Sequence, residues 1–130
     1  MKRVILGFAA VAGLAGSAAH AADFDGSRTL LCANMEAMDC VAGEACLKGL
    51  PDDIGAPQFM RIDFARKAIV GPKRESPIRT MEQSEGQLLL QGTEQSYGWT
   101  IALDQQSGKT VVTILNRDGA FVVFGACTPL

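Results

Sequence analysis

Four cysteines are the side chains in this sequence whose spacing points most clearly to a chemical role. Cys32, Cys40, Cys46 and Cys127 are separated by seven, five and eighty residues. A zinc site favours C-x-x-C pairs or histidines, and the single histidine, His20, precedes all four cysteines. An even number of cysteines in a small exported domain predicts a disulfide framework. We therefore expect two disulfides.

Four cysteines allow three pairings, and the sequence alone does not select one of them. We favour Cys40–Cys46, which closes a tight loop around Gly43, together with Cys32–Cys127, which ties the last strand to the first segment. The second loop is long, so its closure would restrict the unfolded chain by about 4 kcal/mol in the loop-entropy view.

Carboxylates offer a second kind of chemistry, because glycoside hydrolysis needs two carboxyl groups at a defined separation. The candidates are Glu36, Asp39, Asp63 and Glu94. No histidine follows His20, so a Ser-His-Asp triad is excluded from the rest of the chain. Neither a dinucleotide-binding motif nor a P-loop occurs. The sequence predicts no cofactor and no metal, and it leaves a carboxylate-based hydrolase as an alternative.

A basic cluster is the clearest signal for a partner. Its six members lie within nineteen positions: Arg61, Arg66, Lys67, Lys73, Arg74 and Arg79. Only two acids, Asp63 and Glu75, interrupt them, while the rest of the chain is acidic. Such a cluster can meet an anionic headgroup, a cell-wall polymer or an acidic protein. The alternative is an ordinary solvated rim of a hairpin. The overall acidic charge argues against nucleic acid as the partner.

Tyr97 and Trp99 are the most prominent aromatic pair. They alternate with Ile101 and Leu103 on one face of a segment with a clear period of two, which predicts a strand. A pair of this kind either packs into a small β core or lines a ligand pocket. The alternation places Trp99 on the inward face in both cases.

Residues 1–22 have the three-part pattern of a secretory signal peptide. Lys2 and Arg3 precede an apolar run, and Ala19-His20-Ala21 fits a cleavage site. The apolar run has about 12 residues, whereas a membrane-spanning helix needs roughly 20. Cleavage would leave a single β domain, residues 23–130, with 10 basic and 14 acidic residues and a net charge of −4. We expect a soluble periplasmic or secreted protein without a transmembrane span.

The elements that must position these groups are short strands separated by turns. We predict strands over residues 29–39, 59–64, 68–70, 78–81, 87–91, 97–103, 110–115 and 120–126. The last of these is apolar on both faces, so we expect it to be well buried. Residues 40–58 are rich in Gly, Pro and Asp and are predicted as a long functional loop. The fold class that follows is all-β, a small antiparallel barrel or sandwich held by two disulfides.

Several segments resemble a family of small exported proteobacterial proteins of uncharacterised function. The segments are Phe59-Met60-Arg61-Ile62-Asp63, Leu89-Leu90-Gln91-Gly92, Gly98-Trp99, Ala102-Leu103-Asp104, Ser107-Gly108, and residues 121–129. The resemblance covers most of the chain after residue 22 and implies no activity and no site. The expected architecture is also similar to that of periplasmic lysozyme inhibitors, but their inhibitory loop motif has no residue-by-residue match here, and fold alone does not imply function.

The leading hypothesis is a non-catalytic periplasmic interaction module whose loops or basic cluster contact an unknown protein or an anionic component of the cell envelope. A small-molecule carrier with a cavity near Tyr97 and Trp99 is the alternative, and a carboxylate-based hydrolase is a further one. A cavity of about 300 Å³ or more would favour the carrier, because ligand pockets have this size.

Overall fold

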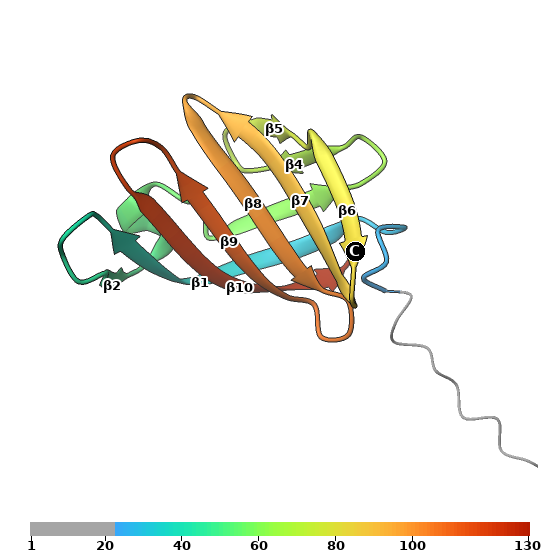
Figure 1. Cartoon of the computed structure of the whole chain (residues 1–130). Coiled ribbons are helices and arrows are strands. Elements are labelled where there is room, and N and C mark those ends of the chain that lie inside the picture. The colour runs from blue at the N-terminus through green and yellow to red at the C-terminus, as the bar shows by residue number, and fades with distance from the viewer. Residues whose placement is uncertain (1–22) are drawn as a thin grey trace, which may run out of the picture.

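The computed structural model describes residues 23–130, so the signal peptide predicted for residues 1–22 lies outside the described residues. The described chain forms one curled antiparallel sheet of ten strands with a single 3-10 helix (Figure 1). The elements in chain order are β1 (Leu30–Cys40), β2 (Leu47–Gly49), η1 (Pro51–Ile54), β3 (Phe59–Asp63), β4 (Ala68–Val70), β5 (Glu75–Pro77), β6 (Thr80–Ser84), β7 (Gln87–Glu94), β8 (Tyr97–Asp104), β9 (Lys109–Leu115) and β10 (Ala120–Pro129). The predicted all-β class is confirmed.

The sheet curls into a half-barrel. Its two edge strands follow each other directly in the chain, so the two edges must lie close together. The strand order is β5-β4-β3-β1-β10-β9-β8-β7-β6, with β2 paired to β1. Strands β5 and β6 thus stand at opposite edges, although only Ile78 and Arg79 separate them. The N–H of Ile78 donates to the carbonyl of Lys67 and the N–H of Arg79 donates to the carbonyl of Gln91, both at 2.8 Å. This crossing brings β5 into contact with β7, and we call the line between them the seam.

Both favoured disulfides are present. Cys32–Cys127 joins directly paired positions of the first and last strands, β1 and β10. Cys40–Cys46 closes the hairpin between β1 and β2. All four cysteines of the chain are therefore bonded. Small domains bury a limited core, so cross-links of this kind contribute a substantial share of their stability.

A β-bulge at Met35 reverses the facing of β1. The pairing register with β10 shifts between Asn34 and Glu36, which leaves Met35 without an opposite residue. Leu30 and Asn34 are buried before the bulge, Ala37 is buried after it, and Met35 itself is exposed. Bulges re-aim side chains and are common beside functional sites. Here the last inward residue before the bulge, Asn34, is polar.

One end of the half-barrel is filled with apolar side chains. Leu30, Ile62, Leu90 and Leu103 are completely buried there. Phe24 packs against the same cluster from the segment before β1. The inward face alternates with a more polar outer face along most strands, which is the pattern expected for a curled sheet with one buried side.

Three sequence predictions need correction. The strand predicted over residues 78–81 begins later, at Thr80, because Ile78 and Arg79 form the crossing between the two sheet edges. The predicted loop over residues 40–58 contains a short strand and a 3-10 helix, β2 and η1. The segment 120–126 is buried on one face only, since Phe124 points outward and is 40% exposed. The outer face of a one-layer sheet has no second layer to cover it. No helix among residues 23–130 is long and apolar enough to cross a membrane.

Candidate functional site

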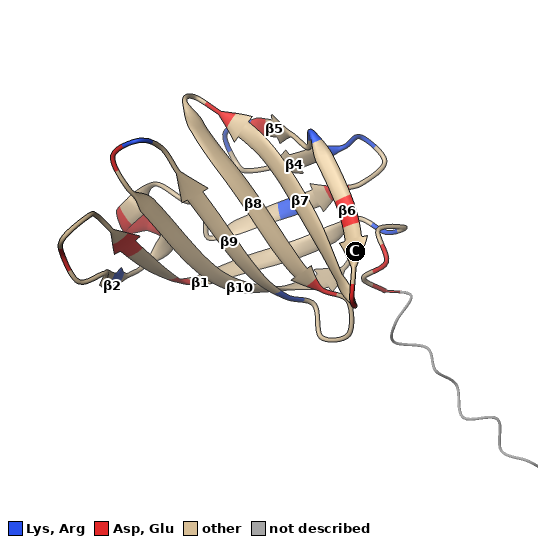
Figure 2. Ribbon diagram, in the orientation of Figure 1, with Lys and Arg blue, Asp and Glu red and all other residues tan. Residues whose placement is uncertain are grey.

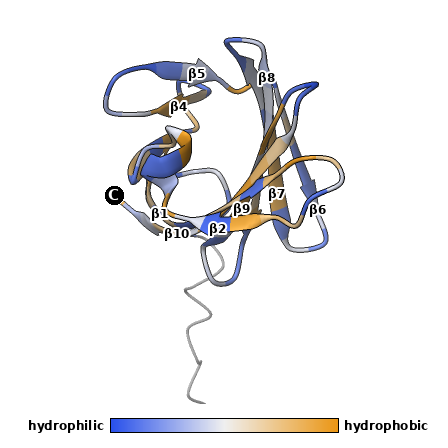
Figure 3. Ribbon diagram, turned by 90° about the vertical axis from the view of Figure 1, so that its left-hand side faces the viewer, coloured by the Kyte–Doolittle hydropathy of each residue, from blue (hydrophilic) through white to orange (hydrophobic). Residues whose placement is uncertain are grey.

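A cavity of about 310 Å³ lies inside the half-barrel, and the completely buried leucines of the filled end do not line it. The inward residues of β8, β9 and β10 form one wall, and β3, β4, β5 and the segment around η1 form the other. Most of the lining side chains are apolar. The end view in Figure 3 shows how the strands curve around this region. The volume meets the size expected of a small-molecule site.

Trp99 forms the wall of the cavity at the seam. It is 9% exposed, so the prediction that it faces inward is confirmed. Its indole N–H donates a hydrogen bond of 2.9 Å to the hydroxyl of Ser76 on β5, which joins β8 to the opposite edge. Gly92 on β7 lies directly opposite Trp99, and a Cβ at this glycine would overlap the indole ring. An aromatic side chain packed over a strand glycine is a known way to fix pairing.

An ion pair lies at the rim of the cavity, also across the seam. The guanidinium of Arg74, in the β4–β5 turn, contacts the carboxylate of Glu94 at the end of β7. The same guanidinium donates to the side-chain oxygen of Gln95 at 3.3 Å. Tyr97 lines the cavity beside them and is 36% exposed. The rim is therefore polar and the interior behind it apolar, an arrangement typical of ligand sites.

The loop that carries η1 is fixed to β1 by Asn34. The side-chain amide of Asn34 donates to the carbonyl of Pro57 and its backbone N–H donates to the carbonyl of Gln58, both at 2.8 Å. Asp53 caps η1 by accepting a hydrogen bond of 2.8 Å from the N–H of Leu50. The expectation that this long loop contributes to a site remains a prediction, and its residues 54–57 line the cavity.

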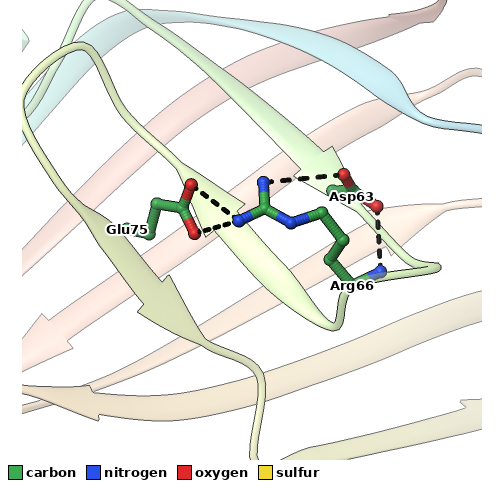
Figure 4. A network of polar contacts seen from close by, with 3 residues as sticks. All are labelled: Asp63, Arg66 and Glu75. Carbon is green, nitrogen blue, oxygen red and sulfur yellow. Dashed lines mark hydrogen bonds and ion pairs between the residues drawn. The ribbon is translucent and has the colours of Figure 1, made fainter.

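The basic cluster is partly neutralised. Arg66 donates to both oxygens of Glu75, at 2.9 and 2.7 Å, and lies 4.0 Å from Asp63 (Figure 4). The hydrogen bond and the charge of Glu75 raise the pKa of Arg66. Arg74 is held by Glu94 as described above. The other four members form no ion pair within residues 23–130: Arg61, Lys67, Lys73 and Arg79.

These basic residues lie mainly on and around the turns that flank β4 (Figure 2). Lys67 and Arg79 line a hollow of about 190 Å³ beside the crossing from β5 to β6. Arg61 is on the outer face of β3 and Arg74 alone among the six lines the large cavity. The cluster is thus distributed over β3, the two turns and the crossing, and its role as a binding surface stays a prediction.

Three of the four candidate carboxylates are each paired with a different basic residue, and the fourth, Asp39, is exposed on β1. Glu36 pairs with Lys48 at 2.6 Å, Asp63 with Arg66, and Glu94 with Arg74. Among the described residues that line the cavity, Glu94 is the only carboxylate. Within residues 23–130 no group of three or more His, Cys, Asp or Glu is arranged to hold a metal ion.

Sequence reasoning identified Tyr97 and Trp99 but missed Asn34, Ser76 and Glu94 as cavity residues. Asn34 is a polar residue at an inward position of β1, where the other inward residues are apolar. This irregularity is the one sequence signal that indicates a polar group in the cavity. The placement of Ser76 and Glu94 depends on how the two sheet edges meet, which no local pattern encodes.

The comparisons with known proteins add no relative. No protein-family model, no curated protein and no solved structure matches this chain. The resemblance to small exported proteobacterial proteins therefore stays a prediction, and the function has to be argued from the cavity itself.

Proposed function

We propose that this protein is a non-catalytic binding protein that holds one small, largely apolar molecule in the cavity of its half-barrel. The observation that carries the proposal is the cavity of about 310 Å³ with Trp99 as one wall. Small globular proteins usually fill their interiors to the density of organic crystals and leave few voids larger than a water molecule. A space of this size behind a polar rim is therefore best explained by a ligand.

The composition of the cavity wall supports binding rather than hydrolysis. Apolar residues such as Ile101, Val112 and Val123 dominate the wall. A two-carboxylate mechanism needs a pair of carboxyl groups flanking the bond to be cleaved. The single carboxylate in the described lining, Glu94, is already paired with Arg74.

The compartment that we propose is the periplasm or the exterior of the cell. Two disulfides are typical of proteins that fold under oxidising conditions. A binding protein there would sequester or carry a small hydrophobic compound through an aqueous space. The basic cluster is a weaker candidate for the principal binding surface, because Arg66 and Arg74 are engaged by internal acids.

Trp99 is the only tryptophan of the chain, so its single indole N–H signal in a proton–nitrogen NMR spectrum reports on the cavity. We expect toluene and phenol, used as probes, to shift this signal in a saturable way at millimolar concentrations. An apolar ring that enters the cavity must contact the lining that includes Trp99.

A matched pair of variants on β9 separates cavity binding from surface adsorption. Ile114 lines the cavity, whereas its neighbour Leu115 points outward and is 50% exposed. Ile114→Phe should fill part of the cavity and weaken probe binding at least ten-fold, while Leu115→Phe should leave it unchanged. Failure of both probes to shift the Trp99 signal of the unmodified protein would refute the proposed function.

A further inference from the structure

Two charged side chains line the cavity, and they carry opposite signs. Arg74 and Glu94 are the only Lys, Arg, Asp or Glu residues in the described lining. Arg74 lies in the β4–β5 turn and Glu94 at the end of β7, so they come from opposite sides of the seam. The other lining residues have apolar or uncharged polar side chains. The fixed charge that a ligand meets in the cavity therefore depends on this one pair.

The two charges compensate each other at the rim. The guanidinium of Arg74 contacts the carboxylate of Glu94. The side chain of Glu94 is 27% exposed, whereas that of Arg74 is 59% exposed and stays within reach of a group that enters from solvent. Such a group also interacts with the carboxylate of Glu94 beside it. Attraction by one member and repulsion by the other then nearly cancel, so neither an anion nor a cation gains much from the pair.

The interior behind the rim disfavours a charge of either sign. Ile101, Val112 and Val123 form part of the wall there, and all three are buried. An ionised group that moves from water into such surroundings loses its hydration, which is strongly unfavourable unless a counter-charge compensates. The described lining offers no charged residue besides the rim pair, and the members of that pair already neutralise each other.

We infer that the Arg74–Glu94 pair sets the charge selectivity of the cavity and restricts it to uncharged ligands. This inference rests on the proposed binding function and names its ligand class, which is neutral apolar compounds as opposed to amphiphilic acids and amines. Each member of the pair cancels the attraction that the other would exert on an ion. Loss of the charge of Glu94 leaves a positive rim that favours anions, and loss of the charge of Arg74 leaves a negative rim that favours cations.

Three probes of similar shape test the inference. Toluene is neutral, benzoate is an anion and benzylammonium is a cation at neutral pH. Their affinities follow from titrations of the indole signal of Trp99, which lines the cavity. The unmodified protein should bind toluene about ten-fold or more tightly than either ion, because neither ion finds a free counter-charge to compensate its lost hydration.

Glu94→Gln and Arg74→Gln each remove one charge and the same ion pair, so they separate charge selection from a structural role. In Glu94→Gln the affinity of benzoate relative to toluene should rise about two- to five-fold, and that of benzylammonium should fall. In Arg74→Gln both changes should reverse. A purely structural role of the pair would affect both variants alike. Lys73→Gln is the matched control and should leave both ratios unchanged, because Lys73 lies in the same turn but does not line the cavity.

The outcomes distinguish the two proposals. Ratios that change in the same direction in both variants, or in neither, would overturn the inference and leave cavity binding intact, as would equal binding of the three probes by the unmodified protein. A change in Lys73→Gln as large as that in Arg74→Gln would also overturn it. Absence of binding by both neutral probes, toluene and phenol, would refute the proposed function itself. The opposite signs expected for the two variants keep either one decisive if the other does not fold.

Discussion

Gly92 provides the sharpest test of how the seam is built. This glycine is on β7, opposite Trp99, and a Cβ at its position would overlap the indole ring and lie 2.6 Å from the carbonyl oxygen of Pro77. A backbone oxygen cannot rotate away as a flexible side chain can. Gly92→Ala must therefore displace either the β5 edge or the Trp99 ring, and both movements disturb the seam.

The expected loss of stability is about 2–3 kcal/mol. Overpacking by one methyl group in a tight interior costs about 1–3 kcal/mol. Displacement of the ring also weakens the hydrogen bond from Trp99 to Ser76, which contributes about 0.5–1.5 kcal/mol. The lower entropy of an unfolded chain with alanine offsets about 0.4–1 kcal/mol of this. For a domain of this size the melting temperature should fall by about 8–12 °C.

Gly98→Ala is the matched control, because it places the same methyl group on the same hairpin. Gly98 is on β8, and a Cβ there meets nothing within 4 Å. Urea unfolding followed by circular dichroism should show Gly98→Ala at or above the stability of the unmodified protein and Gly92→Ala well below it. Equal unfolding midpoints for the two variants would refute the close packing of Trp99 against Gly92.

Four further outcomes are expected. Trp99→Ala should destabilise the protein by about 3–5 kcal/mol, as for other buried aromatic residues, and an unchanged melting temperature would mean that the ring does not contribute to packing. Alkylation without reduction should label no cysteine, and mass spectrometry that finds even one adduct would contradict the two disulfides. Hydrogen bonds from the Ser107 side chain and backbone lower the pKa of Asp104 below 3.8. Its stabilisation of the β8–β9 turn is therefore complete above pH 3.8 and is lost as the pH falls through the lowered pKa. The difference in melting temperature between the unmodified protein and Asp104→Asn should shrink as the pH falls below 3.8, and a difference that does not change with pH in acid would exclude this carboxylate as its source. If the unpaired members of the basic cluster bind an anionic surface, the double variant Lys67→Glu, Arg79→Glu should no longer co-sediment with anionic lipid vesicles at low salt. Its free energy of unfolding should change by less than about 1 kcal/mol per site. Equal pelleting of the variant and the unmodified protein would leave these residues as ordinary solvated side chains.

The features that sequence patterns predicted are those that depend on neighbouring residues. The alternation of residues around Trp99 predicted that its side chain faces inward, and the short spacing between Cys40 and Cys46 favoured their disulfide. The pairing of Cys32 with Cys127 could be favoured because it joins the first and last strands of a small sheet, which lie side by side here. Local periodicity and turn residues encode these properties directly.

The cavity could not be predicted, because it depends on contacts between distant segments. A strict period of two in β1 would keep every second residue after Asn34 on the inward face. The bulge after Asn34 shifts this alternation by one residue for the rest of the strand. Likewise, nothing near Gly92 in the sequence indicates that Pro77 on β5 approaches it so closely. The missing information is how the sheet edges meet, which the whole chain determines.

The cross-link between the two terminal strands has a mechanical consequence. β1 and β10 run antiparallel side by side, and Cys32–Cys127 lies two residues inside the outermost pair, Leu30 and Pro129. A pulling force applied at these two ends would separate only the outermost pairs before the covalent bond carried the load. The strands that surround the cavity lie beyond that bond, so tension along the chain would bypass them and leave the binding space undeformed.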